Sequence, residues 1–397
     1  MQHKVLECIS KKKYDIFEKM ILSHKAALSS RTIVIWGAGV LGIQFSMVLK
    51  KFCDKEFFFC DNDPQKWGKT KMETKILSPQ ALENKSSEFF IFLAIEEAPD
   101  CTLQIQNMGY KNGCDWCNLD DEVQKNFVLN FTENTDAECL VFADCISENV
   151  SIEDVEDGSI GDNLNLNCST KIVSLNGLYM RAYYNLLAVL SAKMKNLKTV
   201  MFLIDLSTFA PRVHLLKGNQ HANLMKLVLG REGTLEEEQR QFLQETEKRS
   251  NTLAFEGVAN IQNDSASEVQ IELAKKVYTK LNYMYTWDEY SESVVYLERI
   301  LQICAEQHIK LMFVLMPINY ILAKRYFGEQ FTEKYGAILS HLNDHLKKPC
   351  VKTIDLSFLL QEKDFISITN TSEGIRASGR TETVRAIFDA INLEEDG

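Results

Sequence analysis

The sequence lacks several features that would assign it to a class at once. No stretch approaches the roughly 20 consecutive apolar residues of a membrane-spanning helix, because the longest candidate, Leu311–Leu322, is interrupted by Pro317 and Asn319. The first residues, MQHKVLECISKKKYDIF, contain no apolar core of the length that a signal peptide requires. We therefore expect a cytoplasmic protein with no integral membrane segment.

Positive charge is also scarce. The 44 lysines and arginines are outnumbered by 55 aspartates and glutamates, which gives a net charge of −11 and a pI near 5.3. A nucleic-acid-binding protein needs a basic face to neutralise phosphates, so we expect no nucleic-acid partner. The remaining composition, with 45% apolar and 25% charged residues, is ordinary for a globular protein, and 397 residues are enough for two or three domains.

Metal-binding patterns are incomplete. The 11 cysteines are odd in number and irregularly spaced, which predicts reduced and mostly buried thiols. Cys114 and Cys117 form a lone CxxC pair without the second pair of ligands that zinc requires. His341 and His345 have the spacing of two ligands on one helix face, but no third ligand accompanies them in the sequence. We favour a solvent-exposed helix face over a metal centre.

A glycine-rich turn is the most informative feature that the sequence does contain. Residues Ile33–Gly42 read IVIWGAGVLG, and FFFCDNDP follows about two dozen residues later. This order predicts a βαβ unit whose helix N-terminus faces a phosphate group. Gly37 allows the sharp turn out of the strand, Gly39 leaves space for a pyrophosphate beside the backbone, and Gly42 allows the helix to pack closely on the sheet.

Asp61 stands at the end of the second predicted strand, Phe57–Cys60. A carboxylate at this position can accept hydrogen bonds from two ribose hydroxyls and would repel a 2′-phosphate, so it favours NAD over NADP if either binds. The alternative is a unit that keeps its tight turn and holds a different ligand, or none. The catalytic spacing Tyr-x-x-x-Lys is absent from this region and occurs only at Tyr320 and Lys324, where a helix face is the favoured interpretation.

The N-terminal region resembles the nucleotide-sugar-binding-like domains of bacterial surface-glycan enzymes, including sugar acyltransferases. The resemblance is carried by IVIWGAGVLG, FCDNDPQKWGK, ILSPQAL, FFIFLAI and LQIQNMGY. It implies a Rossmann-like nucleotide-binding module at residues 31–125. Residues 1–30, which have apolar positions such as Val5, Ile9 and Ile16 among lysines, are expected to form a helical prefix. The resemblance also implies a small phosphate-bearing or sugar ligand, with NAD or a nucleotide sugar as the possible cofactor. The polar, acidic residues 120–137 predict a linker.

The rest of the chain alternates short apolar runs with amphipathic segments, which predicts a second parallel sheet with helices on both faces. The predicted strands are Cys139–Ala143, Lys171–Leu175, Val200–Ile204, Leu311–Leu315 and Val351–Leu356. We expect an α/β protein with two parallel-sheet α/β/α domains. The second domain covers residues 137–397 and contains a helical insertion at about 232–310.

This second part resembles the SGNH or GDSL-type hydrolases, which have a flavodoxin-like fold, and in particular their divergent members in surface-polysaccharide acylation. The family ends its first strand in Gly-Asp-Ser, and here Asp144 and Cys145 follow the strand. The resemblance implies that the Gly177 N–H stabilises an oxyanion. Asp205 replaces the family's Gly-x-Asn-Asp motif, and Arg376 stands in the stretch where the family has Asp-x-x-His.

These departures bear on the chemistry. A serine nucleophile needs an adjacent base, and an arginine such as Arg376 stays protonated and cannot serve as one. Cys145 is a candidate nucleophile in its own right, because a thiol at a helix N-terminus can have a lowered pKa, although no histidine lies at the expected place.

We therefore expect a bacterial surface-glycan protein that acts as a divergent acyl esterase or acyltransferase on a small-molecule or glycan substrate. A catalytically degenerate binding or scaffold protein and an NAD-dependent sugar oxidoreductase remain as alternatives, and an oligomer is possible.

Overall fold

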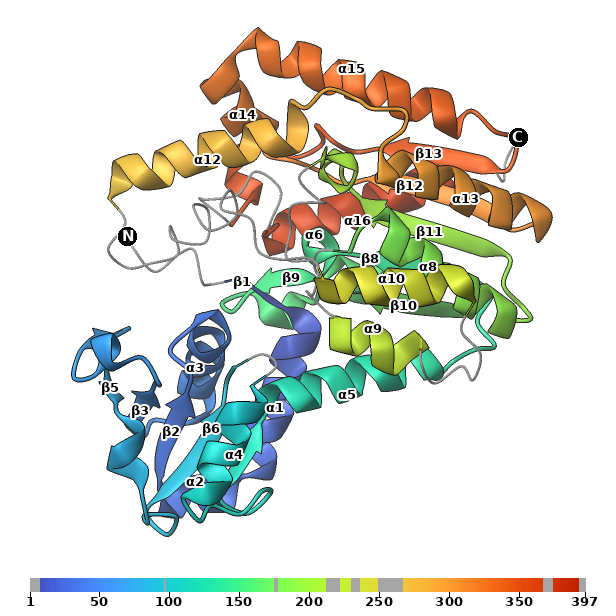
Figure 1. Cartoon of the computed structure of the whole chain (residues 1–397). Coiled ribbons are helices and arrows are strands. Elements are labelled where there is room, and N and C mark those ends of the chain that lie inside the picture. Colours follow the sequence, from blue (N-terminus) through green and yellow to red (C-terminus); the bar gives the residue numbers. More distant parts are fainter. Residues whose placement is uncertain are drawn as a thin grey trace. The chain divides into compact units, whose positions relative to one another are not determined.

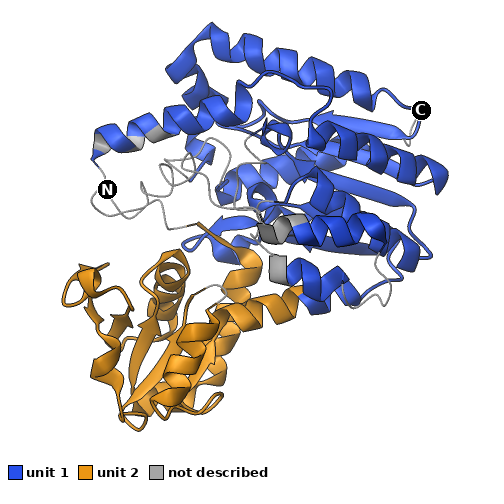
Figure 2. Ribbon diagram, viewed as in Figure 1, with its two compact units in different colours: residues 1–5, 128–397 blue, residues 6–127 orange. Residues whose placement is uncertain are grey.

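The computed structural model describes residues 8–95, 98–174, 178–211, 222–229, 236–248, 267–366 and 374–392. In these ranges the chain is an α/β protein with two largely parallel sheets. It divides into two compact units (Figure 2). The N-terminal unit contains residues 6–127, and the C-terminal unit contains residues 128–397 together with 1–5.

The N-terminal unit is built around a sheet with the strand order β4-β5-β3-β2-β6-β7, in which only the β4–β5 pair is antiparallel (Figure 1). Its elements are β1 (Cys8–Ser10), α1 (Lys11–Ser23), α2 (Lys25–Ser30), β2 (Thr32–Trp36), α3 (Val40–Phe52), β3 (Phe57–Cys60), η2 (Pro64–Lys66), β4 (Thr70–Lys71), β5 (Thr74–Leu77), η3 (Pro79–Leu82), β6 (Phe89–Leu93), α4 (Pro99–Asn107) and β7 (Trp116–Asn118). The predicted strands at 33–36, 57–60 and 89–95 are therefore confirmed to within two residues.

Both faces of this sheet are covered, which explains why its central strands β2, β3 and β6 are almost continuously apolar rather than apolar at alternate positions. On one face Phe45 of α3 packs against Phe92 of β6, with ring centroids 4.5 Å apart, and Phe17 of α1 packs on Phe45. On the other face Trp36 and Ile105 of α4 belong to one buried cluster. The helical prefix thus contributes to the core of this unit.

The expected linker at 120–137 is wrong in its first part. Residues Leu119–Thr132 form helix α5, within which the boundary between the two units falls. Three acidic residues occupy its first turn, namely Asp120, Asp121 and Glu122. Negative charge at a helix N-terminus is stabilised by the helix dipole, so the acidic composition that indicated a linker is also that of a helix start.

The C-terminal unit contains five parallel strands in the order β10-β8-β11-β12-β13. Its elements are β8 (Cys139–Ala143), α6 (Cys145–Glu148), β9 (Asn149–Ser151), η4 (Val155–Asp157), α7 (Ile160–Asn163), β10 (Thr170–Ser174), α8 (Met180–Lys193), β11 (Thr199–Ile204), η5 (Leu206–Phe209), α9 (Ala222–Leu229), α10 (Glu237–Lys248), α12 (Glu268–Tyr283), α13 (Glu292–Glu306), β12 (Lys310–Leu315), α14 (Tyr320–Phe327), α15 (Glu329–Leu346), β13 (Val351–Asp355), η9 (Glu362–Asp364) and α16 (Ala377–Asn392). The predicted strands are confirmed over their described residues, with Leu175 lying outside them, and helices α10, α12 and α13 lie in the described parts of the predicted insertion.

A ladder of three phenylalanines crosses the middle of this sheet. Phe202 of β11 lies directly opposite Phe142 of β8 and Phe313 of β12, and both neighbouring rings are stacked on it with centroids 5.1 Å away. Tyr183 of α8 packs edge-on against Phe142 and Phe202, each at 5.4 Å. The opposite face is closed by α16, whose Ile387 is fully buried. The sheet therefore carries helices on both faces.

Helix α8 is itself held in place by a buried arginine. Arg181, with only 6% of its side chain exposed, forms ion pairs with Glu238 of α10 at 3.0 Å and with Glu292 of α13 at 2.9 Å. The rings of Phe242 and Tyr296 lie against its guanidinium. An arginine buried with paired carboxylates fixes the geometry of the helices that supply them. Tyr183, two residues further along α8, is therefore on a rigid support.

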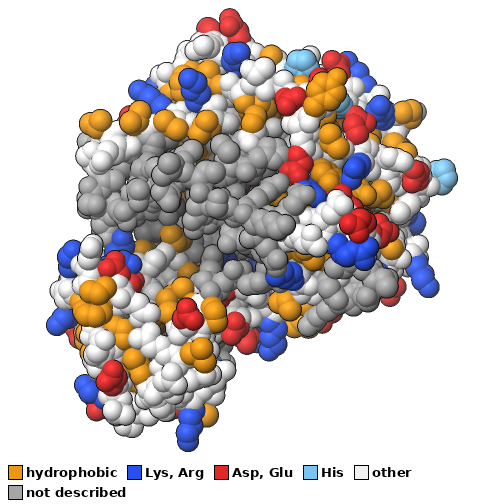
Figure 3. Space-filling model, viewed as in Figure 1, with side chains coloured by type: hydrophobic (Ala, Val, Ile, Leu, Met, Phe, Trp, Pro, Cys, Tyr) orange, Lys and Arg blue, Asp and Glu red, His pale blue; other side chains and the backbone are white. Residues whose placement is uncertain are grey.

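No described helix has the length and apolar character that a membrane span requires. On the face displayed in Figure 3, the acidic and basic side chains of the described residues are interspersed, and no broad region of positive charge is visible there.

Candidate functional site

The carboxyl ends of β8 and β11 bring together the residues that the sequence singled out in the C-terminal unit. The two strands are parallel neighbours, with Ala143 opposite Leu203, so the residues that follow them, Asp144 and Asp205, emerge at the same edge. Within this sheet the chain passes from β8 to β10 on one side and then to β11 on the other. Ligands of open parallel sheets bind outside the carboxyl ends where the strand order reverses in this way.

Asp144 and Cys145 form the turn that leaves β8. The Asp144 carboxylate is the N-cap of α6 and accepts a hydrogen bond from the backbone N–H of Ile146 at 3.0 Å. Aspartate is favoured at this position because its oxygen satisfies an N–H that has no partner within the helix. Cys145 is the first residue of α6, and its half-buried thiol packs at the margin of the apolar cluster beneath α16. The turn fixes the thiol beside the end of β8.

Asp205 is completely buried at the end of β11. One of its oxygens accepts hydrogen bonds from the backbone N–H of Ser207 at 2.9 Å and from the Ser207 hydroxyl. The other oxygen accepts one from the hydroxyl of Tyr283 in α12. A carboxylate can only accept hydrogen bonds, so Asp205 does not supply the amide donor that the SGNH family places after this strand.

Four tyrosines surround this edge, of which Tyr183, Tyr283 and Tyr335 are buried and Tyr285 is half-buried, and sequence reasoning missed all of them. Besides Tyr283, the Tyr285 hydroxyl donates to the Leu206 carbonyl at 2.8 Å, and the Tyr335 hydroxyl donates to Ser357 Oγ at 2.7 Å. Burial, with the nearby Asp205 charge, raises the pKa of Tyr285 well above the usual value of a tyrosine. These tyrosines come from segments far apart in the sequence, and no spacing relates them to the strand ends.

The fourth tyrosine, Tyr183, is fully buried, and its hydroxyl has no hydrogen-bond partner in the described part of the chain. Burial is the main cause that raises its pKa well above the usual value, and the charges of Asp144, Cys145 and Asp205 add to it. These three groups therefore lie near the hydroxyl, although none is hydrogen-bonded to it. An unpaired buried hydroxyl costs about 1–3 kcal/mol.

Two sequence-predicted residues of the C-terminal unit remain, Gly177 and Arg376. Gly177 lies outside the described residues. Arg376 precedes α16, where its backbone N–H donates to the Asp364 carbonyl at 2.7 Å. In the described ranges, no hydrogen bond or ion pair joins its side chain to Asp144, Cys145 or Asp205. The structure therefore assigns no contact with the strand ends to Arg376.

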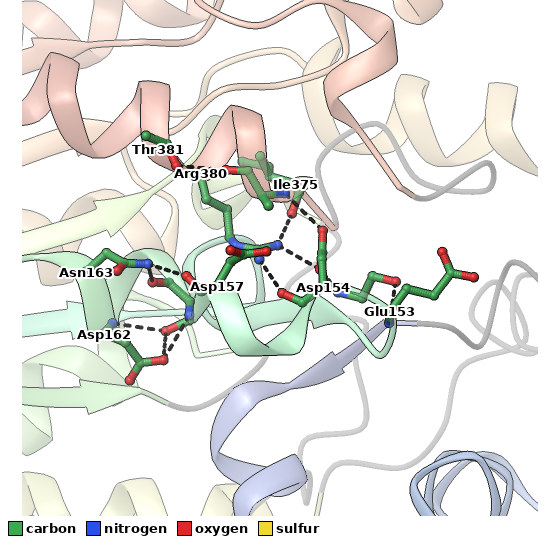
Figure 4. Close-up of polar contacts among 11 residues, drawn as sticks. Glu153, Asp154, Asp157, Asp162, Asn163, Ile375, Arg380 and Thr381 are labelled. Atoms are coloured by element: carbon green, nitrogen blue, oxygen red, sulfur yellow. Dashed lines mark hydrogen bonds and ion pairs between the residues drawn. The ribbon is translucent and has the colours of Figure 1, made fainter. Parts of the chain in front are cut away.

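The neighbouring Arg380 has a structural role. Its side chain is 1% exposed and lies 3.3 Å from the Asp154 carboxylate, and it also donates to the carbonyls of Asp154 at 2.9 Å and Ile375 at 2.7 Å (Figure 4). The second Asp154 oxygen accepts the Ala377 N–H at 3.0 Å. This network connects the start of α16 to the segment after β9, and the ion pair with Asp154 offsets the charge of Arg380.

In the N-terminal unit, the glycine turn has the geometry expected for each glycine. Gly37 has a φ of +119°, and a Cβ there would lie 2.5 Å from the Ala94 carbonyl oxygen. A Cβ on Gly42 would lie 1.9 Å from the Gly37 oxygen. Around Gly39, in contrast, no atom of the described residues other than its chain neighbours lies within 4 Å of the position a Cβ would take. This open space lies at the N-terminus of α3, which has no side-chain cap, so the turn fits a phosphate group.

Asp61 is more occupied than the sequence suggested. One oxygen accepts the Ala38 N–H of the glycine turn at 3.2 Å and lies 2.9 Å from the Lys66 ammonium, and the other accepts the Asp63 N–H at 3.0 Å. Trp67 donates to the Asp61 carbonyl at 2.7 Å and so closes the turn after β3. Lys66 therefore partly offsets the negative charge that Asp61 would present to a 2′-phosphate.

The His341–His345 pair is joined by carboxylates from elsewhere in the chain. Both nitrogens of His345 lie 2.6 Å from a carboxylate oxygen, one of Glu298 and the other of Glu289. Glu289 also approaches His341 at 3.4 Å. Burial lowers the pKa of His345, but the hydrogen bonds to Glu298 and Glu289 outweigh it and raise the pKa above its usual value.

In the described residues, no group of three or more possible ligands is arranged to hold a metal ion. The two CxxC cysteines differ in exposure, since Cys114 is exposed and Cys117 is buried in β7. Tyr320 and Lys324 lie on α14, where Tyr320 packs against Phe358 and Lys324 pairs with Glu329 at 3.0 Å.

Protein-family models and curated protein sequences were both compared with the chain, and no match was found in either.

We expect Gly42→Ala and Gly39→Ala to differ strongly in their effect on the stability of the N-terminal unit. Gly42→Ala should lower the free energy of unfolding by at least about 1–3 kcal/mol through overpacking, whereas Gly39→Ala should change it by no more than about 1 kcal/mol. Urea unfolding of the two variants measures this difference. Equal destabilisation by both substitutions would contradict the open space at Gly39.

We expect His345 to stabilise the C-terminal unit in a pH-dependent way. Because its pKa is raised on folding, the stabilisation is complete below the unfolded-state pKa of about 6.5 and is lost as the pH rises through the higher folded-state value. His345→Gln should therefore cost about 0.5–1 kcal/mol at pH 6 and little at pH 9, as measured by thermal unfolding. His341→Gln is the matched control, and a larger effect of the control would refute the assignment.

Proposed function

We propose that the C-terminal unit is a divergent SGNH-hydrolase-like domain with a flavodoxin-like sheet. The proposed activity is hydrolysis or transfer of an acyl group carried by a sugar, in the synthesis or modification of bacterial surface glycans. The observation that carries the proposal is the position of Asp144 and Cys145. They follow the first strand of a sheet ordered second, first, third, fourth, fifth, at the point where that order reverses.

Cys145 is the proposed nucleophile. Its sulfur attacks the acyl carbonyl carbon of a sugar ester and forms a C–S bond, and the carbonyl oxygen becomes an oxyanion. The tetrahedral intermediate then collapses, the C–O bond to the sugar breaks, and the sugar oxygen takes up a proton to replace the one that the thiol released to solvent. Attack by water or by a second sugar hydroxyl on the thioester releases the acyl group and restores the thiol.

A cysteine can carry out these reaction steps without a histidine partner. A serine hydroxyl is almost entirely protonated at neutral pH and needs a base, whereas a free thiol is a few per cent ionised at pH 7 and is intrinsically a strong nucleophile. The replacement of the family's serine by Cys145 and the loss of its histidine are therefore chemically consistent with each other. The rate should rise with pH as the thiolate fraction grows.

The N-terminal unit is proposed to hold the phosphate-bearing part of a nucleotide sugar, or NAD. Such a group would approach the backbone at Gly39, with Gly37 and Gly42 shaping the turn and the free N–H groups at the start of α3 facing the phosphate. Asp61 and its partner Lys66 would lie near the adjoining ribose. This binding would supply a sugar substrate or a regulatory ligand, and it does not require redox chemistry.

A second candidate is a binding protein of the same fold without turnover. It is favoured by Asp205, whose two oxygens are already engaged by Ser207 and Tyr283, at the position where the family supplies a catalytic amide. The two candidates differ in one outcome, because a binding protein is stabilised by acylated sugars but does not release the acyl group.

We expect the wild-type protein to hydrolyse p-nitrophenyl acetate or O-acetylated sugars, and Cys145→Ala and Cys145→Ser to lose at least about 10³-fold in kcat/KM. The serine variant should fail because the sequence has no histidine where the SGNH family supplies its base. Cys168→Ala is the control, since Cys168 is exposed and lies in the same unit. Unchanged activity in the Cys145 variants would refute the mechanism, and a thermal shift with acylated sugars without turnover by the wild type would support the binding protein.

A further inference from the structure

We infer that the outward face of α12 is a surface through which two copies of this chain associate, with their α12 helices packed antiparallel. The inference goes beyond the proposed function and does not depend on it, because it rests on an apolar row and a charged row of one helix. Its test measures association and requires no enzymatic activity.

Four apolar side chains form a continuous row on α12, which we call the α12 ridge. They are Val269, Leu273, Val277 and Leu281, with exposed fractions of 76%, 61%, 40% and 38%. Residues four apart are neighbours on the surface of a helix, so the four form one ridge about 18 Å long. In Figure 3, hydrophobic side chains follow the line of α12 at the upper left.

The α12 ridge faces away from the core of the C-terminal unit. Thr279, Asn282 and Tyr283 lie on the opposite side of the helix and are fully buried, and the Tyr283 hydroxyl is hydrogen-bonded to Asp205. The helix is thus anchored by its other side, while the ridge lies at the surface. Contiguous exposed apolar residues mark an interaction site, whereas apolar residues scattered singly over a surface do not.

A row of charged residues beside the ridge indicates the partner. Each member of this row directly precedes a residue of the ridge, and the row reads Glu268, Glu272, Lys276, Lys280. The side chain of Glu272 is 47% exposed, although Lys275 lies 3.6 Å from its carboxylate, and Lys276 and Lys280 are exposed. The row on the other side of the ridge is uncharged and consists of Gln270, Ala274, Tyr278 and Asn282. The charge on α12 is therefore confined to one side of the ridge and changes sign at its middle.

This charge pattern is complementary to itself, which points to a second copy of the chain. In a two-fold pair of antiparallel helices, the same side of each helix faces the same side of the other with the direction reversed. The acidic half of one charged row then lies beside the basic half of the other, and Glu272 of one copy faces Lys276 of the second. In a parallel pair, the charged row would face the uncharged row.

The apolar residues fit the same arrangement. Rows of residues four apart on two helices interdigitate in the commonest mode of helix packing in globular proteins. An antiparallel pair centred between Leu273 and Val277 places each of these side chains near the other in the second copy, and Val269 near Leu281. The ridge and the charged row thus favour one common register.

The first experiment measures the association of the full chain by sedimentation velocity. We expect a reversible dimer with a Kd in about the micromolar range, because one pair of helices makes a small interface. Leu273→Glu places two like charges at the centre of the paired ridges and should raise the Kd at least about 100-fold. Leu103→Glu is the matched control, since Leu103 is 57% exposed on α4 of the N-terminal unit, and it should leave the Kd unchanged. Circular dichroism verifies that both variants are folded.

The second experiment tests the antiparallel pairing by exchanging charges. Glu272→Lys alone sets two ammonium groups against each other in the dimer, and Lys276→Glu alone sets two carboxylates against each other, so each should raise the Kd by about 10-fold. An equimolar mixture of the two variants restores opposite charges across the interface and should dimerise as tightly as the wild type. Effects within one helix cannot produce this recovery, because mixing does not alter either helix.

The alternatives give different results. A wild type that stays monomeric up to about 100 μM, or a dimer that Leu273→Glu leaves intact, would overturn the inference. Binding of a monomeric wild type to vesicles of phosphatidylcholine and phosphatidylglycerol, lost in Leu273→Glu, would assign the ridge to lipid and also overturn it. A mixture of the charge variants no tighter than either variant alone would refute the antiparallel pairing, and this comparison decides the question if Leu273→Glu fails to fold.

Discussion

The parallel pairing of β8 with β11 is the constraint on which the proposed site depends. The register places Phe142 opposite Phe202 and Ala143 opposite Leu203. A slip by one residue would move every side chain of the strand to the opposite face and would break the stacked phenylalanine ladder. The phenylalanine ladder on one face and the contacts with α16 on the other both require this register. The packing of the core therefore brings Asp144 and Asp205 to one edge of the sheet.

Burial then determines the chemistry of that edge. Asp205 accepts hydrogen bonds from an N–H group and from the Tyr283 hydroxyl, and the surrounding tyrosines stay protonated because ionising them in this environment is costly. Arg380 and Arg181 show the other solution, in which a buried guanidinium is matched by carboxylates. These arginines hold helices in place, whereas the strand ends carry tyrosine hydroxyls and the thiol of Cys145, the proposed nucleophile.

Much of the fold was predictable from the sequence, because continuous apolar runs such as 139–143 and 200–204 are typical of strands that are buried on both faces. The roles of Gly37 and Gly42 were also predictable, since only a residue without a Cβ fits there. Helix α5 was missed because its acidic start is common to linkers and helix N-termini. Tertiary contacts place Lys66 beside Asp61, Glu289 and Glu298 beside His345, and Tyr183 against Phe142 and Phe202. No periodicity in the chain encodes such contacts.

The central claim is that the strand ends of β8 and β11 make Cys145 the reacting thiol of the chain. The most direct measurement is to mix the protein with p-nitrophenyl acetate, stop the reaction rapidly in acid, and locate the acyl group on the 11 cysteines by peptide mass mapping. The account predicts that Cys145 is acylated before Cys114 and Cys168, although Cys145 is half-buried and the other two are exposed. Acylation of Cys114 and Cys168 with Cys145 unmodified would contradict it.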